Sequence, residues 1–230
     1  MSSRKEDMLV NKLNIKTKEL FDCEIDYLKP YFDAAEYPWK ILPKIKEICA
    51  KTVQNGLDGY TLLSEGVLVG RNVKIAKTAT ILPPAIIGHD TEIRPGAFIR
   101  GNVIIGEHCV IGNSSEFKNC ILLNNVQCPH YNYVGDSILG NHSHTGAGTV
   151  CSNLKSDGKN IVIHGDKEYE TGLRKIGAFV GDYGDCGCNA VLNPGTIVGR
   201  HTQVYPLTRA RGVYPENSIV KDTFVVVDKY

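Results

Sequence analysis

The chain has 230 residues, and its 26 Lys and Arg against 25 Asp and Glu leave a formal net charge of +1. This length suits one domain with a small appendage, and the balanced charge excludes nucleic-acid or membrane binding driven by a broad basic field. No long apolar run follows the charged N-terminus, so we expect a cytoplasmic protein without a membrane span. The eight cysteines form no CxxC pair and lie in apolar stretches, which predicts free core thiols and no zinc ribbon.

Residues 17–55 mix charged and apolar side chains at spacings of three and four, which is typical of short helices. Pro30, Pro38 and Pro43 interrupt the pattern, so we expect two or three helices. We assign residues 1–60 to an N-terminal helical cap over the open end of the structure that follows, because solenoids need capped ends.

A period of six residues runs from Val69 to Pro129. Ten of these eleven positions carry a large apolar side chain, and the residue two positions earlier is usually small or β-branched. A six-residue period fits a short strand plus a tight turn and is the signature of a parallel β-helix of hexapeptide repeats. The repeats predict about six triangular coils. Glycine often follows the large residue, as at Gly88 and Gly106, which predicts repeated corners with positive φ.

Two interruptions break the period. Ten residues between Pro129 and Leu139 replace a multiple of six, and residues 152–175 form a polar stretch too long for a turn. Breaks in a regular solenoid indicate a role other than packing. We assign residues 61–205 to the β-helix, with the inserted loop at 152–175, and residues 206–230 to a C-terminal tail that packs on the prism.

A resemblance to a known family rests on four segments: EIRPGAFIR (92–100), IGNSSEFKN (111–119), CPHYNYVGDSILG (128–140) and HTGAGTVCSNLKSDGK (144–159). Together they resemble the acetyltransferase half of the bacterial bifunctional enzyme that makes UDP-N-acetylglucosamine, and its archaeal sugar-1-phosphate nucleotidylyltransferase relatives. The resemblance implies a left-handed β-helix and a homotrimer with sites between subunits. The glycine-rich loop of the family's nucleotidyltransferase domain is absent, so nucleotidyl transfer is not expected.

The resemblance also implies N-acetyl transfer from acetyl-CoA to an amino-sugar 1-phosphate of the glucosamine or galactosamine type. Its catalytic histidine corresponds to His130. An imidazole, with an ordinary pKa near 6.5, suits removal of a proton from an attacking amine near neutral pH. The amine attacks the thioester directly, so we expect neither a covalent acyl-enzyme nor a metal requirement.

Fixed positive charge is needed for the sugar phosphate, and arginine can hold two phosphate oxygens while lysine acts as a mobile point charge. The resemblance implies these substrate-binding residues: Arg94, Lys118, Lys159, Tyr133, Asn153, Glu116 and His144. His144 replaces a family Asn, and Leu154 replaces a family Tyr, so the identity of the sugar stays open.

Donor binding is expected at Ala147 and Gly148, whose segment matches backbone N–H groups near the thioester carbonyl. Such donors would stabilise the developing oxyanion. Asp182 stands where the family has a Ser that contacts acetyl-CoA, and Arg209 is a candidate for the donor phosphates by charge alone. The carboxylate at position 182 leaves the acyl donor open.

Three alternatives stay open. A γ-class carbonic anhydrase would hold zinc with three histidines, two of them five residues apart, and no His pair here has that separation. The chain could instead be a non-catalytic protein that binds or senses a sugar phosphate or sugar nucleotide. It could also be an acyltransferase on another acceptor.

Overall fold

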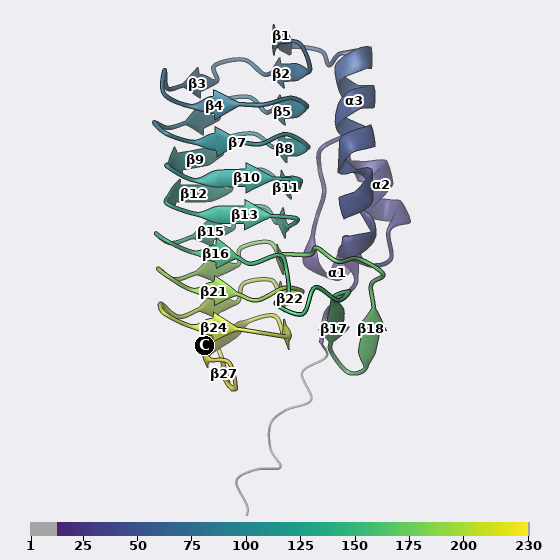
Figure 1. The fold of residues 1–230 in the computed structure, drawn as a ribbon, viewed down its shortest axis with the longest axis vertical. Coiled ribbons are helices and arrows are strands. Elements are labelled where there is room, and N and C mark those ends of the chain that lie inside the picture. Colours follow the sequence, from purple (N-terminus) through teal and green to yellow (C-terminus); the bar gives the residue numbers. More distant parts are fainter. Residues whose placement is uncertain (1–12, 230) are drawn as a thin grey trace, which may run out of the picture.

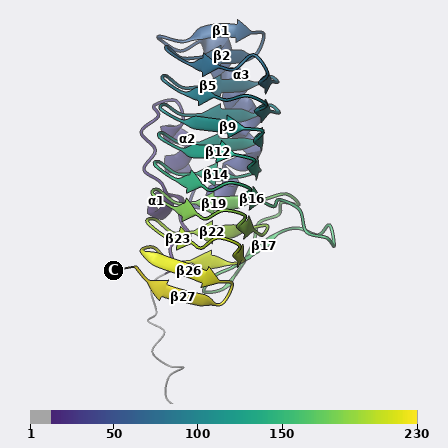
Figure 2. The ribbon, with the colours of Figure 1, turned by 90° about the vertical axis from the view of Figure 1, so that its left-hand side faces the viewer.

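Residues 13–229 are described by the computed structural model, in which short strands stack into a three-sided prism with helices along one side (Figure 1). The strands of each sheet follow one another in chain order, so successive coils add one strand to each of three sheets. A loop projects from the lower half (Figure 2), and a small hairpin lies below the helices (Figure 1). The prediction of a mainly β protein, built as a parallel β-helix of hexapeptide repeats, is confirmed.

The helical segment contains α1 (Thr17–Leu20), α2 (Lys29–Ala34), the 3-10 turns η1 (Pro38–Lys40) and η2 (Leu42–Lys44), and α3 (Ile45–Asn55). Sheet A contains β1 (Thr61–Ser64), β2 (Val67–Val69), β5 (Ala85–Ile87), β8 (Val103–Ile105), β11 (Cys120–Leu122), β14 (Ile138–Leu139), β19 (Ala178–Val180), β22 (Thr196–Val198) and β25 (Val213–Tyr214). Sheet B contains β3 (Lys74–Ile75), β6 (Glu92–Ile93), β9 (Val110–Asn113), β12 (Gln127–His130), β15 (His144–Thr145), β20 (Asp185–Cys186), β23 (Gln203–Val204), β26 (Ser218–Asp222) and β27 (Val225–Asp228). Sheet C contains β4 (Thr80–Ile81), β7 (Phe98–Ile99), β10 (Glu116–Lys118), β13 (Tyr133–Gly135), β16 (Val150–Cys151), β21 (Val191–Leu192) and β24 (Arg209–Ala210), and the small hairpin pairs β17 (Val162–His164) with β18 (Glu168–Glu170).

The interior of the prism is filled by the apolar side chains that recur every six residues. Val67 pairs with Ala85, and Ala85 pairs with Val103, so one coil takes eighteen residues. These side chains belong to one continuous buried cluster with Ile93 and Ile99 from the other two sheets. Burial of this column supplies the main driving force for the stack.

The phase of the repeat slips by one residue at the corner after β10. Leu122, and not Leu123, joins the cluster inside the prism. Glu116 on β10 pairs with Tyr133 on the next coil, an offset of seventeen residues. The same shortening recurs ahead of Leu139, because the inward residues Val134 and Leu139 are five apart, so the period is interrupted there as expected. The chain makes a shortened coil at this point, without an inserted loop.

The glycines after the large residues allow close approach between coils, and they lack the positive φ expected for them. A Cβ on Gly88 would come within 2.4 Å of the backbone of Gly106 on the next coil. Positive φ occurs two residues later, at the non-glycine residues Asp90 and His108. Polar side chains such as Asp tolerate this conformation better than most residues.

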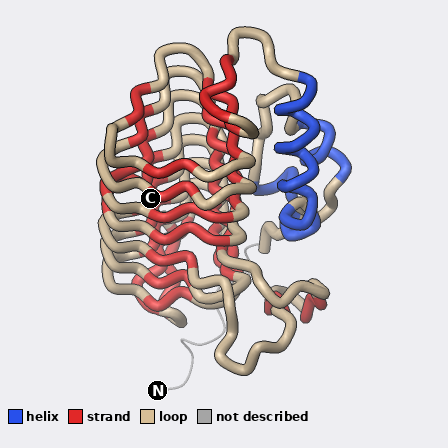
Figure 3. Tube along the Cα trace, turned by 45° about the horizontal axis from the view of Figure 1, so that its top comes forward, coloured by secondary structure: helices blue, strands red, loops and turns tan. Residues whose placement is uncertain are grey.

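The N-terminal helices lie along the outer face of sheet A, and not over the end of the prism (Figures 1 and 3). Ile45 and Ile48 of α3 share a buried cluster with the outward side chains of Ile86, Ile104 and Phe179. An apolar outer face must be covered, and the helices bury it. The helical segment is therefore present as predicted, but its expected position as an end cap is wrong. We call residues 13–55 the helical layer.

Antiparallel strands lie at both ends of the prism. At one end β1 pairs antiparallel with β2, and at the other β27 pairs antiparallel with β26. Parallel pairing also continues past residue 205, where the sequence pattern is expected to end, through β24, β25 and β26. The prism consequently has more coils than the six that the repeat predicts. No helix within residues 13–229 has the length and apolar character needed to cross a bilayer.

Candidate active site

His130 lies at the corner between sheets B and C, at the end of β12, and its side chain is exposed. Asn132 fixes this corner from inside, because its buried side-chain amide donates to the Gly146 carbonyl at 2.8 Å. The side-chain oxygen of Asn132 accepts a hydrogen bond from the His130 N–H at 3.3 Å. Sequence reasoning missed Asn132, although its place between two predicted site residues, His130 and Tyr133, was a signal.

The next coil brings the segment at residues 146–148 against the backbone of His130. The Gly148 N–H donates to the His130 carbonyl at 3.1 Å, and the Gly146 N–H donates to Cys186 at 2.7 Å. Among residues 13–229, no acceptor is found for the Ala147 N–H. Of three successive amides, therefore, that of Ala147 is without an acceptor in the described chain, and it precedes the amide that binds the His130 carbonyl.

Both glycines of this segment have a structural reason: a Cβ on Gly146 would come within 2.6 Å of the Cys188 backbone, and Gly148 has a positive φ. Its φ is +74°, and a Cβ would come within 2.1 Å of the Asn189 side-chain oxygen. The positive φ of Gly148 would strain another residue, and a Cβ would also displace the Asn189 side chain. The corner at residues 146–148 is accordingly a rigid place from which an N–H can be presented.

Tyr133 and Asn153, both predicted to bind the sugar, lie together on the outer face of sheet C. The Asn153 amide donates to the Tyr133 hydroxyl at 3.1 Å and to the Asp136 carboxylate at 2.6 Å. Asn119 donates to the other Asp136 oxygen at 2.8 Å. Partial burial, followed by the negative charge of Asp136 and Glu116, raises the pKa of Tyr133, so the phenol stays neutral at physiological pH.

Gly135 makes this cluster possible. A Cβ on Gly135 would lie 2.5 Å from the Tyr133 hydroxyl and 2.8 Å from the Asn153 amide. The tyrosine side chain therefore folds back over the glycine that follows it on β13 and meets Asn153 there. Neither Gly135 nor Asp136 was assigned a role in the site from the sequence.

A second polar group lies one coil away on the same face. Arg100 forms an ion pair with Glu116 at 2.6 Å, and its guanidinium lies 5.7 Å from the centre of the Phe98 ring. The register that pairs Phe98 with Glu116 makes Arg100 and Lys118 neighbours on adjacent coils. Arg94, at the other edge of the sheet, pairs with Glu92 at 3.3 Å. The structure thus adds Arg100 to the predicted cations.

His144 lies on the outer face of sheet B, on the rung next to Gln127. Its Nδ1 is 2.8 Å from a carboxylate oxygen of Asp185, and both side chains are about half exposed. A carboxylate on Nδ1 fixes the imidazole tautomer, which leaves Nε2 free to meet a ligand. His144 is therefore separated from the Tyr133 cluster, on a different face of the prism.

Asp182 is not available to a donor molecule in the described chain, because its side chain is only 1% exposed. Its oxygens accept from the backbone of Asn141 at 2.7 Å and of Asp22 at 2.8 Å, and they also pair with Arg200. Arg200 in turn binds the Asp22 carboxylate. The expectation that Asp182 contacts the acyl donor is wrong, since this carboxylate ties the helical layer to the prism.

The two remaining predicted residues lie apart from the cluster. Arg209 is exposed on β24, on the same column of sheet C as Tyr133 but three rungs away through Val150 and Val191. Three rungs of parallel strands span about 14 Å. Lys159 is exposed in the inserted loop, where its backbone N–H donates to Asp157 at 3.0 Å.

Known proteins resemble this chain in sequence over most of its length. It is 31% identical over 187 residues to the bifunctional protein GlmU of Methanococcus aeolicus, which covers 74% of the chain and 44% of that protein. It is 30% identical over 211 residues to a bifunctional sugar-1-phosphate nucleotidylyltransferase/acetyltransferase of Sulfurisphaera tokodaii, covering 90% of the chain and 52% of that protein. The chain is a relative of the GlmU-type bifunctional proteins. It spans about half the length of the curated relatives it matches.

Two further comparisons concern this GlmU relative. The family model described as the GMPPB C-terminal domain matches residues 81–169. Among solved structures, UDP-N-acetylglucosamine acyltransferase from Campylobacter jejuni has a TM-score of 0.42 at 14% identity, covering 68% of this chain and 67% of that one. PerB from Caulobacter crescentus, solved with CoA and GDP-perosamine, has a TM-score of 0.40 at 18% identity, covering 64% and 52%.

Proposed function

We propose that this chain is an acetyl-CoA-dependent N-acetyltransferase that acts on an amino-sugar 1-phosphate of the glucosamine or galactosamine type. Two observations carry the proposal. His130 is exposed, and its carbonyl binds the N–H of Gly148, which follows Ala147, whose own N–H has no acceptor within residues 13–229. Acyl transfer to an amine needs a base for the ammonium proton and a donor for the developing oxyanion. The corner offers both groups, and the chain is about 30% identical to bifunctional proteins of the GlmU type.

In the proposed reaction the free amine of the sugar attacks the acetyl carbonyl, and its proton passes to the His130 imidazole. The carbonyl oxygen gains negative charge in the tetrahedral intermediate, where the Ala147 N–H stabilises it. Collapse of the intermediate breaks the carbon–sulfur bond and releases the CoA thiolate, which takes the proton back from the imidazolium. The products are the N-acetyl sugar phosphate and CoA, and no covalent acyl-enzyme or metal ion takes part.

The acceptor would lie across the outer face of sheet C. Tyr133 and Asn153 offer hydroxyl and amide groups to the sugar, while Lys118 and Arg100 offer positive charge to the phosphate on adjacent coils. Arg94 and the loop residue Lys159 are further candidates for the phosphate. His144 would contact substrate from sheet B. Donor phosphates would meet Arg209, and the thioester would pass Ala147 and Gly148.

The same proposal includes a homotrimer in the cytoplasm, with each site completed by a neighbouring subunit. Support comes from the three faces of the prism. The helical layer covers sheet A, so sheets B and C are the faces open to other copies. A closed ring of three subunits uses two different faces of each copy. His130 lies at the corner that these two faces share.

The test is formation of N-acetyl product from acetyl-CoA with glucosamine 1-phosphate and galactosamine 1-phosphate. Loss of the thioester absorbance should be followed, because a thiol reagent would also detect the exposed Cys188. We expect His130→Ala to lower kcat about 100- to 10,000-fold, the range typical of a lost general base. The matched control is His108→Asn, which removes another exposed imidazole at a positive-φ corner that suits Asn.

Each outcome separates the candidate functions. Product from the native chain and not from the His130 variant supports both class and base. Full activity of that variant would retain the class and remove the base. Absence of product with either sugar, in a folded protein that still binds the sugar phosphate, would favour the non-catalytic binding protein. Product with an unrelated amine alone would favour an acyltransferase on another acceptor.

A further inference from the structure

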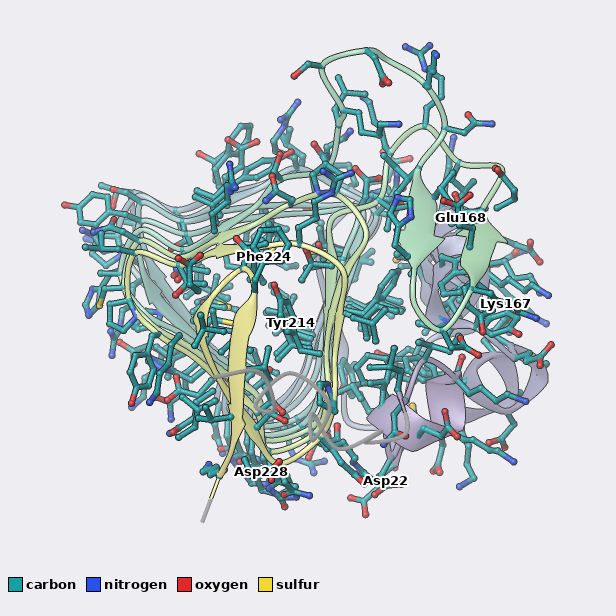
Figure 4. All side chains as sticks on the ribbon, turned by 90° about the horizontal axis from the view of Figure 1, so that it is seen from below. Asp22, Lys167, Glu168, Tyr214, Phe224 and Asp228 are labelled. Carbon is teal, nitrogen blue, oxygen red and sulfur yellow. The ribbon has the colours of Figure 1, made fainter. Side chains whose placement is uncertain are left out.

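The inserted loop does not project freely, because its hairpin of β17 and β18 packs against the helical layer. The Tyr169 ring on β18 lies 5.5 Å from the Tyr37 ring and 6.1 Å from the Trp39 ring. Tyr37 and Trp39 stack at 4.6 Å with an angle of 6°. Ile163 on β17 and Ile161 just before this strand are buried in the apolar cluster that also contains Trp39. Figure 4, viewed along the prism, shows Lys167 and Glu168 of this hairpin beside the helices.

The base of the loop is closed at the acceptor cluster. The Ile176 N–H donates to the Asn153 carbonyl at 3.1 Å, and the Gly177 N–H donates to the Asp136 carbonyl at 2.8 Å. A Cβ on Gly177 would lie 2.1 Å from the Gly135 carbonyl, so the returning chain lies directly on β13. Asn153, which binds Tyr133, and Asp136, which binds Asn153, are thus both held through their backbones by the returning end of the loop.

The tip of the loop, residues 154–160, is hydrogen-bonded to the segment that follows the hairpin. The Arg174 side chain donates to the Gly158 carbonyl at 3.0 Å, and Thr171 donates from its hydroxyl to the Ile161 carbonyl at 2.5 Å. Lys155 pairs with Asp157 at 3.4 Å in the tip. The tip borders a pocket of about 440 Å³ between the loop and the coil ends, with Lys155, His164, Asn193 and Arg211 in its lining.

These contacts form one chain of support from the helical layer to the acceptor site. We propose that Tyr169, seated on Tyr37 and Trp39, is a positioning residue for acceptor binding, which acts through the loop that carries Asn153 and Lys159. The inference rests on the proposed function. When the hairpin is docked on the helical layer, motion of the loop is restricted to its tip, residues 154–160. Without it, the cationic tip explores a larger volume, and ordering it on the acceptor costs conformational entropy.

This mechanism predicts a specific kinetic pattern. Acceptor binding must order the tip when the hairpin is loose, so the KM for the sugar phosphate rises. The base and the oxyanion donor lie at the opposite corner of sheet C and keep their hydrogen bonds, so kcat stays close to that of the native protein. Acetyl-CoA makes no contact with the hairpin in the proposed site, so its KM stays unchanged.

The test compares Tyr169→Ala, Tyr169→Leu and Tyr169→Phe with Glu170→Ala, an exposed residue on the same strand as matched control. We expect the first two variants to raise the acceptor KM about tenfold with kcat within twofold, and Tyr169→Phe and the control to behave as native. Hydrogen exchange at residues 154–160 should quicken in Tyr169→Ala, while the amides of sheets A to C keep their protection.

An unchanged acceptor KM in Tyr169→Ala and Tyr169→Leu, or equal rises in the acceptor and donor KM values, would overturn the inference. Failure of the proposed function is recognised separately, by absence of N-acetyl product from the native chain. Hydrogen exchange at the tip then decides the positioning role by itself. Faster exchange in Tyr169→Ala than in Glu170→Ala supports it, and equal exchange contradicts it.

Discussion

The Gly148 N–H donates a hydrogen bond to the carbonyl of His130 at 3.1 Å, across two adjacent coils. This bond fixes the spacing between the candidate base and the amide of Ala147, which precedes Gly148 in the chain. Any change that rotates the corner at residues 146–148 moves the oxyanion donor relative to the imidazole. The geometry of the proposed reaction is therefore encoded in the backbone as much as in side chains.

Gly148→Ala tests this corner. Glycine takes its φ of +74° without a steric cost, whereas a non-glycine residue there pays about 1–2 kcal/mol, and the new Cβ would also meet Asn189. We expect lower stability to urea and at least a tenfold loss of kcat. Gly172→Ala is the matched control, because its φ is +72° with nothing within 4 Å. Equal stability and equal activity of the two variants would contradict the assigned role.

Cys188 provides a built-in probe of the donor path. Of the eight cysteines, seven are buried and Cys188 is exposed. The Asn189 N–H donates to the Ala147 carbonyl at 2.8 Å, which puts Cys188 on the coil next to the proposed oxyanion donor. We expect maleimide to label one cysteine rapidly and to abolish activity, and CoA to slow the labelling. Cys188→Ser should keep activity and resist the reagent. Labelling at the same rate with and without CoA would separate this corner from the donor path.

Asp182 distinguishes a structural carboxylate from a donor-binding one. Removal of this carboxylate leaves the partly buried Arg200 without one of its two acidic partners. It also leaves the backbone N–H groups of Asp22 and Asn141 without acceptors. We expect Asp182→Ala to lower the free energy of unfolding by about 3–5 kcal/mol, as for other broken buried ion pairs. The KM for acetyl-CoA should be unchanged in the protein that stays folded at low temperature. A raised KM for acetyl-CoA with native stability would restore the expectation drawn from the sequence.

Buried thiols should make the protein sensitive to alkali. Desolvation raises the pKa of Cys49, Cys109 and Cys151 from 9.0 to about 12. Because the folded pKa exceeds the unfolded one, this stability is fully present below about pH 9 and is lost as the pH rises toward 12. At about pH 10 each such thiol lowers the free energy of unfolding by about 1.4 kcal/mol relative to neutral pH. Urea titrations at the two pH values measure the loss, and Cys49→Ala should reduce it by one thiol's share. A flat profile would contradict this account.

The sequence predicts the prism well because its repeat is a direct record of inward packing. It predicts the position of the helices poorly. The outer face of sheet A is marked by an apolar residue between two inward ones, as in Ala85–Ile87 and Val103–Ile105. These three-residue runs indicate a sheet buried on both faces. The apolar outward residues of sheet A can thus be read in the sequence. The period of six, however, records only the inward residues and does not show which outer face of the prism is covered.

The site divides in the same way. Local segments bring His130 and residues 146–148 to one corner and Tyr133 to the adjoining strand, because neighbouring coils align residues about seventeen or eighteen positions apart. Arg100 was missed because its place in the site depends on the ion pair with Glu116 on the adjacent coil. Asp182 was misassigned because its partner Asp22 comes from the helical layer, 160 residues away, although Arg200 lies only one coil further along. Contacts that depend on how a separate layer docks are not recorded in a local repeat.

The reversed strands β1 and β27 have a consequence for solubility. A stack of parallel strands exposes a backbone edge at each end, on which further strands could add without limit, as they do in fibrils. Here the chain turns back on itself at both ends, and β27 lies over the last coil with Tyr214 buried beneath the turn that carries Phe224 (Figure 4). Parallel winding cannot continue past these strands in sheet A at one end or in sheet B at the other, while sheet C ends in β4 and β24 without a reversed strand. The reversed strands therefore oppose end-to-end stacking of prisms at one sheet edge of each end.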